Sequence, residues 1–551
     1  MAYREKLPAL NAANIRIQKG GNEDNKFNTV NFTVQLPFNY REIFDQEYWR
    51  DLKRFDNGEK GNGTYLHLQG QLEERLDDNY WKNETSENME TRRNSWQGNN
   101  NQVVVGFTLA YGNRRNPLTK EMVAQNNFSA LRDPNQKIMV YNCGGPGTGT
   151  HPINQGWFQN FVENGYYVLF PNYRGCPCNL DIESWEPKPT IFNEDVWNSW
   201  KSSRREQASG QIFNLSIRNI ARDIETVRRH LLGEKKWTVQ CQSFGGSISM
   251  CLQSFYAEGI EEVQYCAAMI PINRSAYEVN MELFKVVIAR NEQFFNKYTN
   301  DKKKTKEIVD YLAKYDLKAP SEGKLTPKRF LCLGRALGNT TKFEALHNVI
   351  ESMHTAIQTG SSQSSPEWKE ALKQYEKLDE KGWKNGKRPL YPLLTELQYP
   401  TLLPQKPDWG AERAAANYKE FWWVSKTNRE IIEELQKDKN KPLAFSGEMV
   451  YKSFYEDYPS LQPFKQLAAD LEEKLVLPEP TYDVKALKRN QIPTKVYIPT
   501  KDMHVSLKYS RENLTSFRTI IQRLEDDEAE HGAIRHKPKK ALDYFMFGLR
   551  E

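Results

Sequence analysis

The chain has 551 residues, of which 38% are hydrophobic and 12% aromatic, and its 77 Lys and Arg exceed its 71 Asp and Glu to give a formal charge of +6. This aromatic content excludes a disordered chain, and no apolar run approaches the ~18 residues that a membrane-spanning helix needs. The positive charge is scattered, so nucleic acid is not an expected partner. Seven cysteines without zinc spacing indicate reduced thiols in an intracellular protein, which we expect in the cytoplasm, with mitochondria as the alternative.

The first part of the chain, residues 1–102, is rich in Asn, Gln, Glu and Gly. Short strand-like runs at Val30–Val34 and Tyr65–Leu68 indicate that this region contributes strands to a core sheet. The polar stretch Asn79–Gln102 predicts an insertion loop. We therefore expect a polar N-terminal extension whose strands join the core sheet.

Between residues 103 and 273 the chain alternates between apolar runs and helical patterns. The clearest helix is predicted at Ser216–Leu232, where Ile217, Ile220 and Ile224 recur at three- and four-residue steps. The runs typical of buried parallel strands are Val103–Phe107, Ile138–Tyr141, Tyr167–Phe170, Trp237–Val239 and Val263–Met269. This alternation predicts a parallel sheet covered by helices on both faces, the first part of the core.

Residues 274–480 are mostly helical in pattern, with exposed loops predicted at Thr359–Ser365 and Lys381–Lys387. A strand returns at Thr494–Tyr497, in a second part of the core at residues 481–551, and a helix-like segment follows it. A sheet whose strands are separated in sequence by a helical insertion is the layout of an α/β-hydrolase with a cap. The predicted fold class is α/β: an α/β-hydrolase with a mostly parallel sheet, a helical cap domain and an extended polar N-terminal region.

A serine turn follows one of these strands. In the segment from Trp237 to Gly246, an apolar strand runs into Ser243 and then into a small-residue helix start. A serine at such a sharp turn projects its hydroxyl clear of the sheet, provided that small residues stand two positions away. Gly245 meets this need, whereas Cys241 stands where glycine is usual. An ordinary strand-to-helix turn is the alternative interpretation of this segment alone.

A second glycine-bearing segment follows the strand at Ile138–Tyr141 and contains Gly144 and Gly145. In this fold two backbone N–H groups hold the oxyanion, one from the residue after the serine, here Phe244, and one from a loop after an earlier strand. Gly144 and Gly145 suit the second position because their backbone can approach a substrate closely. A plain Gly/Pro turn is the alternative.

A serine hydroxyl needs a base and a group that orients the base, and the hydrolase chain order is Ser, then acid, then His. Asp502 follows the strand at Thr494–Tyr497 and is the chosen acid. His531 lies 29 residues later and is the chosen base, with His536 as second choice. His504 stands too close behind the acid to be expected to fold back onto it.

These residues together resemble the prolyl aminopeptidases, or proline iminopeptidases, of the α/β-hydrolase superfamily, especially their larger form. The resemblance covers most of residues 103–275 and 390–550 in one consistent order. The segments that carry it are Cys143–Gly147, Asn172–Gly175, Asn219–Leu232, Lys236–Gly246, Phe445–Tyr451, Lys501–Val505 and Glu530–Gly532.

The resemblance implies Ser243 as nucleophile, His531 as general base and then acid, and Asp502 as the residue that orients the imidazole. It also implies that carboxylates of the cap hold the α-ammonium of the substrate, and Glu396 and Glu448 stand at matching places. Surface helix glutamates are the alternative for these two.

Trp409 matches a further family segment and is expected to wall a proline-sized pocket, with a core tryptophan as the alternative. No metal ligand cluster or cofactor is implied by the site.

The predicted function is that of a serine aminopeptidase that releases N-terminal residues, preferably proline, from peptides through an acyl-enzyme. The expected partners are peptides with a free N-terminus, while a homo-oligomer or an assembly through the insertions is left open. Cys143, Cys241 and Asn172 replace residues that are more usual in the family. Two alternatives therefore stay open: a catalytically inactive or drifted hydrolase-fold subunit of a larger assembly, and an esterase or peptidase of different specificity.

Overall fold

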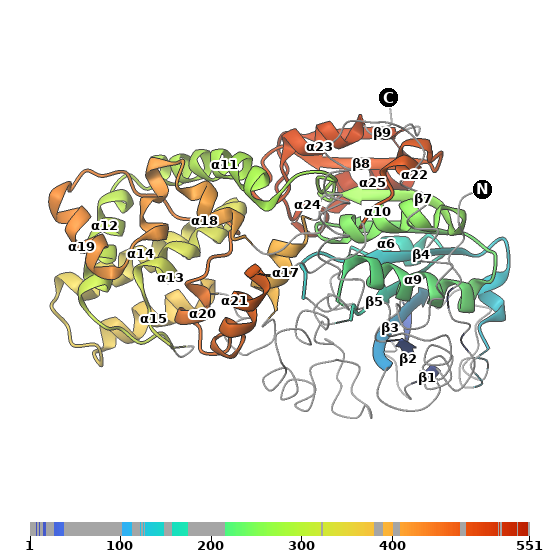
Figure 1. Ribbon diagram of the computed structural model, residues 1–551, viewed down its shortest axis with the longest axis horizontal. Helices are drawn as coiled ribbons and strands as arrows, with labels where there is room; N and C mark the ends of the chain where they lie inside the picture. Colours follow the sequence, from blue (N-terminus) through green and yellow to red (C-terminus); the bar gives the residue numbers. More distant parts are fainter. Residues whose placement is uncertain are drawn as a thin grey trace.

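The computed structural model describes residues 15–17, 27–37, 102–112, 127–147, 157–174, 215–320, 323–379, 390–399, 408–473, 481–515, 521–536 and 538–548, with Leu7, Leu10, Met122, Gln125 and Phe517 as single positions. Three predicted segments lie outside these residues: the strand-like run Tyr65–Leu68, the loop Asn79–Gln102 apart from Gln102 itself, and the loop Lys381–Lys387. Within them, two bodies lie side by side, one built on a sheet and one of helices (Figure 1).

A sheet of nine strands forms the first body, in the order β1-β2-β3-β5-β4-β6-β7-β8-β9 among the described residues. Six of these strands, β5, β4, β6, β7, β8 and β9, run parallel to one another. Their bounds are Lys137–Asn142 for β4, Tyr166–Pro171 for β5, Trp237–Gln242 for β6, Ile260–Cys266 for β7, Thr494–Pro499 for β8 and Ile521–Asp526 for β9. The predicted mostly parallel α/β sheet is confirmed.

The remaining strands are antiparallel and correct one expectation. They are β1 at Ile15–Ile17, β2 at Phe27–Pro37 and β3 at Gln102–Gly112. The run Val103–Phe107 was expected to be parallel, but β3 pairs antiparallel with both β2 and β5. An apolar run indicates that a strand is buried between neighbouring strands. It does not indicate whether those strands run parallel or antiparallel to it.

The last strand, β9, falls in the segment expected to be helix-like. Its sequence alternates weakly, and Gln522 and Arg523 are exposed because β9 pairs only with β8 at the end of the described sheet. Polar edge strands lack the apolar run that marks a buried strand, and charged residues there discourage pairing with other chains. The segment therefore contains a strand between short helices.

Helices cover both faces of the sheet, as consecutive residues of β7 show. The Tyr265 hydroxyl donates to the Gln253 side chain of α10, whereas the Gln264 amide donates to the Phe545 carbonyl of α25 on the other face. The helices of this body are α6 Gln159–Glu163, α9 Ile217–Leu232, α10 Gly245–Phe255, α22 Val484–Arg489, α23 Leu507–Leu514, α24 Ala533–His536 and α25 Pro538–Phe547, with short 3-10 turns at Ser129–Arg132 and Ala257–Gly259. The α9 helix begins after Ser216, whose hydroxyl accepts from the Asn219 N–H.

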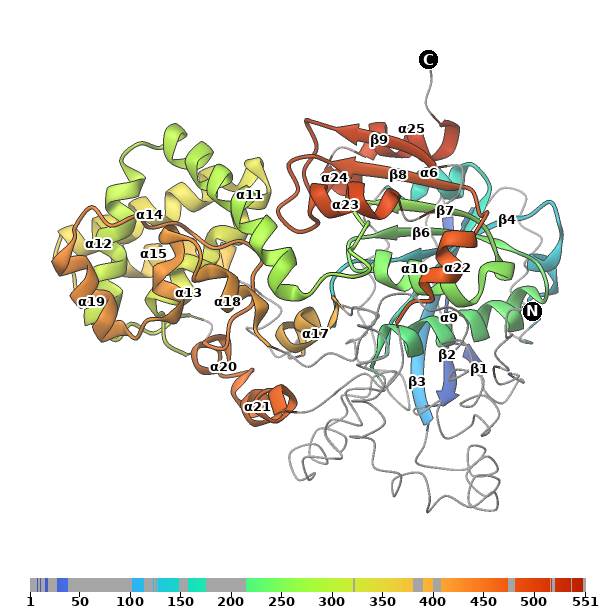
Figure 2. The same cartoon turned by 45° about the horizontal axis from the view of Figure 1, so that its top comes forward.

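The second body is helical and is inserted between β7 and β8 (Figure 2). Its α-helices are α11 Ala276–Lys297, α12 Asp301–Lys314, α13 Pro327–Leu331, α14 Phe343–Gln358, α15 Pro366–Leu378, α17 Tyr391–Leu397, α18 Gly410–Ala415, α19 Asn428–Lys437, α20 Phe454–Asp457 and α21 Lys465–Glu473. Its 3-10 turns are Cys332–Gly338, Thr340–Lys342, Lys419–Ser425 and Gln462–Phe464. Within the described residues, no helix is long and apolar enough to cross a membrane.

Candidate active site

The serine turn joins β6 to α10. Ser243 has a φ of 54°, in the left-handed region that costs a non-glycine residue on the order of 1–3 kcal/mol. The strain is imposed by close packing of the start of α10 against neighbouring strand ends. A Cβ on Gly245 would lie 1.9 Å from the Asn142 carbonyl oxygen, and one on Gly246 would lie 1.7 Å from that of Ala268. The turn thus requires both glycines and presents Ser243 at the C-terminal edge of the sheet.

Cys241 lies two residues before Ser243. It is fully buried within β6, and its Sγ lies 3.6 Å from the Gln264 carbonyl oxygen of the neighbouring strand. Burial raises the pKa of its thiol, so the sulfur stays protonated and acts as a small apolar group. Cys143 is also buried, and its carbonyl accepts from the Tyr173 hydroxyl at 3.2 Å.

The loop after β4 lies directly against the serine. A Cβ on Gly144 would be 2.7 Å from the Ser243 Cβ, so only glycine fits this approach. Gly145 follows with a φ of 81°. The Phe244 residue precedes α10, and its buried ring packs edge-to-face on Tyr173. The structure therefore brings Gly144, Gly145 and Phe244 to the serine turn, beside the N-terminal N–H groups of α10.

Asp502 and His531 form a buried pair after β8 and β9. His531 Nδ1 lies 2.8 Å from Asp502 Oδ2. Asp502 Oδ1 accepts from the backbone N–H groups of His504 at 2.7 Å and Val505 at 2.9 Å. Burial alone would raise the pKa of Asp502, but His531 and these N–H donors hold it below the ordinary value. Asp502 is therefore an ionised acceptor that fixes the ring of His531.

His504 contacts the other side of His531. The two rings are edge-to-face with centroids 4.4 Å apart, and His504 Nδ1 lies 3.0 Å from Glu448 Oε2. Burial lowers the pKa of His504 to about 4, so its ring is neutral near pH 7. The sequence predicted that His504 is not the base, but it did not indicate that the His504 ring packs on His531. Its position two residues after Asp502 was the sequence feature that could have indicated this contact.

A cavity of about 230 Å³ lies between the two bodies and is lined by Ser243, His531, Gly144, Gly145, Glu396 and Glu448. His536 also lines it, but its ring neighbour is the Asn339 amide at 3.3 Å. His531, the first choice of base, is the one paired with Asp502.

The two cap glutamates lie in different environments. Glu448 forms an ion pair with Arg335 and accepts from the Tyr391 hydroxyl at 2.7 Å. Burial opposes ionisation, but Arg335 and then the nearby histidines lower the pKa of Glu448 to about 2. Glu396 is only 4% exposed and accepts from the Gly410 N–H at 3.0 Å; burial raises its pKa to about 8. Arg335 is a cavity residue that sequence reasoning missed, because its partner lies 113 positions away (448 − 335).

Trp409 is not among the residues that line the cavity. Its ring is 2% exposed, packs edge-to-face on Tyr455 and donates through Nε1 to Glu472. A left-handed φ of 52° at Trp409 precedes Gly410, which packs tightly against the Ala276–Tyr277 backbone. The structure therefore shows a tryptophan of the helical core, the alternative interpretation, and not a pocket wall.

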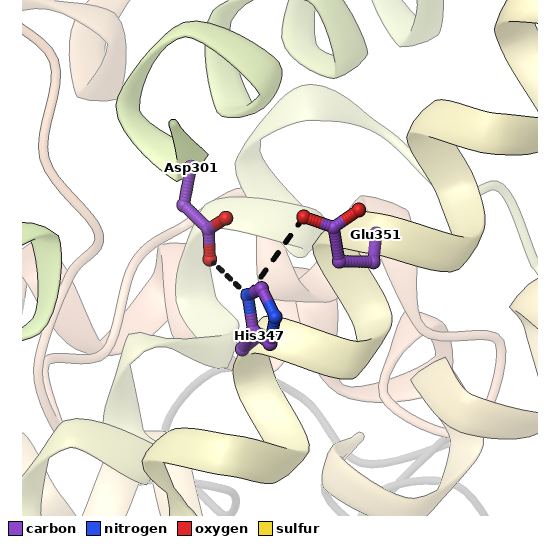
Figure 3. A group of neighbouring side chains, drawn as sticks. All are labelled: Asp301, His347 and Glu351. Atoms are coloured by element: carbon purple, nitrogen blue, oxygen red, sulfur yellow. Dashed lines mark hydrogen bonds and ion pairs between the residues drawn. The ribbon is translucent and has the colours of Figure 1, made fainter. Parts of the chain in front are cut away.

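One group with metal-ligand chemistry occurs among the described residues, in the helical body (Figure 3). His347 Nδ1 lies 2.8 Å from Asp301 Oδ2 and 4.0 Å from Glu351 Oε1. The Lys304 ammonium already forms an ion pair with Glu351, and the His347 ring stacks on Tyr298. These contacts tie the start of α12 to α14.

The parallel sheet, the strained serine after β6, the acid after β8 and the histidine after β9 follow the chain order of the α/β-hydrolases, and the chain is an α/β-hydrolase by fold. No family model matches the chain. It is 26% identical over 425 residues to a proline iminopeptidase of Aspergillus aculeatus, covering 76% of this chain and 86% of that protein. It is 25% identical over 407 residues to a proline iminopeptidase of Aeromonas sobria, covering 74% and 85%. The resemblance to the proline iminopeptidases is thereby confirmed.

Among solved structures, a proline iminopeptidase of Mycobacterium smegmatis matches 75% of this chain and 90% of its own, at 9% identity and a TM-score of 0.30. A crystal structure of VinJ matches 80% of this chain and 93% of its own, at 11% identity and a TM-score of 0.31.

Proposed function

We propose that this chain is a serine aminopeptidase that releases N-terminal residues, preferably proline, from peptides. One observation carries the proposal: Ser243, strained at a φ of 54°, opens into the same cavity as His531, whose Nδ1 is 2.8 Å from Asp502. This is the set of groups that serine acyl transfer requires. Relatives named proline iminopeptidases support the choice of substrate.

In the proposed reaction, the Ser243 oxygen attacks the first peptide carbonyl while its proton passes to His531 Nε2. The N–H groups of Phe244 and of the Gly144–Gly145 loop hold the oxyanion. His531 then gives the proton to the departing amine as the C–N bond breaks. Water repeats the sequence on the acyl-enzyme and frees the N-terminal residue, while Asp502 stabilises the imidazolium in both halves.

Recognition of the N-terminus is assigned to Glu396 and Glu448, which both line the cavity. The pKa of Glu396 near 8 means that it is mostly protonated at pH 7. An incoming ammonium would favour its ionised form, so binding would release a proton from the carboxyl group. Two carboxylates near the first residue would also fix the register at which the first peptide bond meets Ser243.

The direct test compares wild type with Ser243→Ala on an N-terminal proline arylamide. Hydrolysis is expected to vanish in the variant and to persist in Ser247→Ala, a matched change four residues along α10 at a serine that does not line the cavity. Activity that survives Ser243→Ala would remove the mechanism. Folding of each variant is checked by circular dichroism.

A second candidate is a hydrolase for substrates without a free amine. The Arg335–Glu448 ion pair favours it, because one of the two carboxylates already has a cation. Under this alternative, short esters and N-acetylated arylamides are cleaved at least as fast as proline arylamide. Under the first proposal, the free amine is required.

A further inference from the structure

The residue that precedes Ser243 also reaches the active-site histidine. Gln242 is the last residue of β6, is fully buried, and lines the cavity. Its Nε2 lies 3.3 Å from the His531 carbonyl oxygen and 3.2 Å from His531 Nε2. Residues 289 positions apart are therefore joined at two points.

The direction of these contacts follows from the donors available. A backbone carbonyl can only accept, so the nitrogen end of the Gln242 amide must face His531. Asp502 is ionised and can only accept, so His531 Nδ1 carries the proton in the neutral ring. His531 Nε2 then offers a lone pair, and the second amide hydrogen of Gln242 donates to it.

We infer that Gln242 is a positioning residue, which holds the His531 ring in the Nδ1-protonated form and stabilises its neutral state through Nε2. The inference rests on the proposed function for its catalytic consequence. The tautomer it selects is the one in which Nε2 can take the proton of Ser243. Among the described residues, no hydrogen bond joins the Ser243 hydroxyl to His531, so Gln242 occupies this lone pair in the structure and Ser243 replaces it when substrate binds.

The Gln242 amide oxygen fits this arrangement. It has no hydrogen-bond partner among the described residues, and it lies beside the Gly144 backbone, where a Cβ would approach it to 2.6 Å. A buried amide that leaves its oxygen unpaired gives up a hydrogen bond, so both contacts with His531 are made at a cost.

Other groups also act on His531 and must be held constant. The titratable and charged groups that pack on it or share its cavity come from the loop after β8, the cap and α24: Asp502, His504, Glu396, Glu448, Arg335, Lys342, Tyr391, Tyr399, Arg535 and His536. None of them is changed by a substitution at position 242.

The test uses Gln242→Met, which keeps the length of the side chain and removes the donor. Because a neutral hydrogen bond to Nε2 favours the unprotonated ring, the acid limb of kcat/KM is expected to move up by about 0.5–1 pH unit. In Gln242→Glu, the new carboxylate favours the imidazolium, so the acid limb is expected to move up by at least about one pH unit.

The matched control is Gln240→Met, the same change two residues earlier on the same face of β6, at a side chain that is also fully buried. It is expected to leave the acid limb in place. A Gln242→Met profile that keeps the wild-type acid limb would overturn the inference.

A second measurement does not depend on activity. In a Ser243→Ala background with ¹⁵N-labelled histidine, NMR reports which ring nitrogen of His531 carries the proton and the pH at which the second proton binds. We expect the Nδ1-protonated ring, and an upward shift of that pH on adding Gln242→Met. A ring protonated at Nε2, or no shift, would contradict the role of Gln242 even if the chain proves not to be a peptidase.

Discussion

Arg335 and Glu448 form an ion pair in the wall of the cavity that also contains Ser243. Their side chains are 32% and 19% exposed, so the pair is shielded but within reach of a substrate. The Tyr391 hydroxyl donates to the same carboxylate, and His504 Nδ1 lies 3.0 Å from it. The cap therefore presents an ionised glutamate that has a cation before substrate arrives.

Removal of that cation should strengthen the binding of free-amine substrates. In Arg335→Met, the Tyr391 hydroxyl still donates to Glu448, and the charge of Glu448 is less compensated. We expect KM for proline arylamide to fall about fivefold relative to an N-acetylated analogue, which corresponds to about 1 kcal/mol for a partly screened charge. Steady-state kinetics on both substrates provide the measurement. An equal rise in KM for both would show that Arg335 serves only to position Glu448.

Neutralising either glutamate should have the opposite effect. Glu396→Gln and Glu448→Gln are each expected to raise KM for the free amine by about tenfold while changing the N-acetylated analogue little. Glu412→Gln, which changes a half-buried glutamate that does not line the cavity, is the control. Equal effects on both substrates would argue against ammonium binding.

The difference in stability between wild type and Glu396→Gln should depend on pH. Burial raises the pKa of this carboxyl from 4.5 to about 8, so the folded protein holds a proton that the unfolded chain has lost in that range. Wild type therefore loses stability as pH rises through the window, by at most about 1.4 kcal/mol per pH unit from this group. Glu396→Gln is expected to remove this slope, so that its advantage over wild type grows up to about pH 8. Urea unfolding of both proteins at several pH values measures this difference. Free energies of unfolding that change in parallel with pH would contradict the raised pKa of Glu396.

Asp502→Asn should leave the fold and remove most of the activity. An amide can present its donor to His531 Nδ1 and so select the wrong ring tautomer. We expect kcat to fall by about 10⁴, the loss seen when the acid of a serine–histidine–aspartate triad is changed to its amide. The control, Asp527→Asn, changes an exposed aspartate after β9. A loss below tenfold would show that Asp502 does not orient the base.

Cys241 should matter for stability and not for rate. Its side chain is buried between strands, so Cys241→Gly removes packing and loosens a strand interior. We expect a loss of about 1–3 kcal/mol in the free energy of unfolding, with kcat unchanged. A higher kcat in Cys241→Gly would show that the thiol does crowd the serine turn.

The sequence predicted those features whose signal is local. The apolar runs located β4 to β8, and the small residues around Ser243 marked the strained turn, because each pattern lies within about ten residues. Polar β9 gave no such pattern and was missed.

Long-range pairings could not be foreseen in the same way. The contacts of Arg335 with Glu448 and of Gln242 with His531 join segments far apart in the chain, and only the folded arrangement of the two bodies brings them together. Trp409 shows the opposite case. The family resemblance placed it in the pocket wall, but its backbone is left-handed and its ring is buried in the helical core.

Activation of Ser243 by His531 is the central claim, and covalent labelling tests it without knowledge of the substrate. A fluorophosphonate probe is incubated with wild type, Ser243→Ala and His531→Asn, and the adduct is located by peptide mass spectrometry. We predict one adduct on Ser243 in wild type, none in Ser243→Ala and labelling slowed by at least about 10²-fold in His531→Asn. An unlabelled, folded wild type, or equal labelling of Ser243 in His531→Asn, would contradict the account.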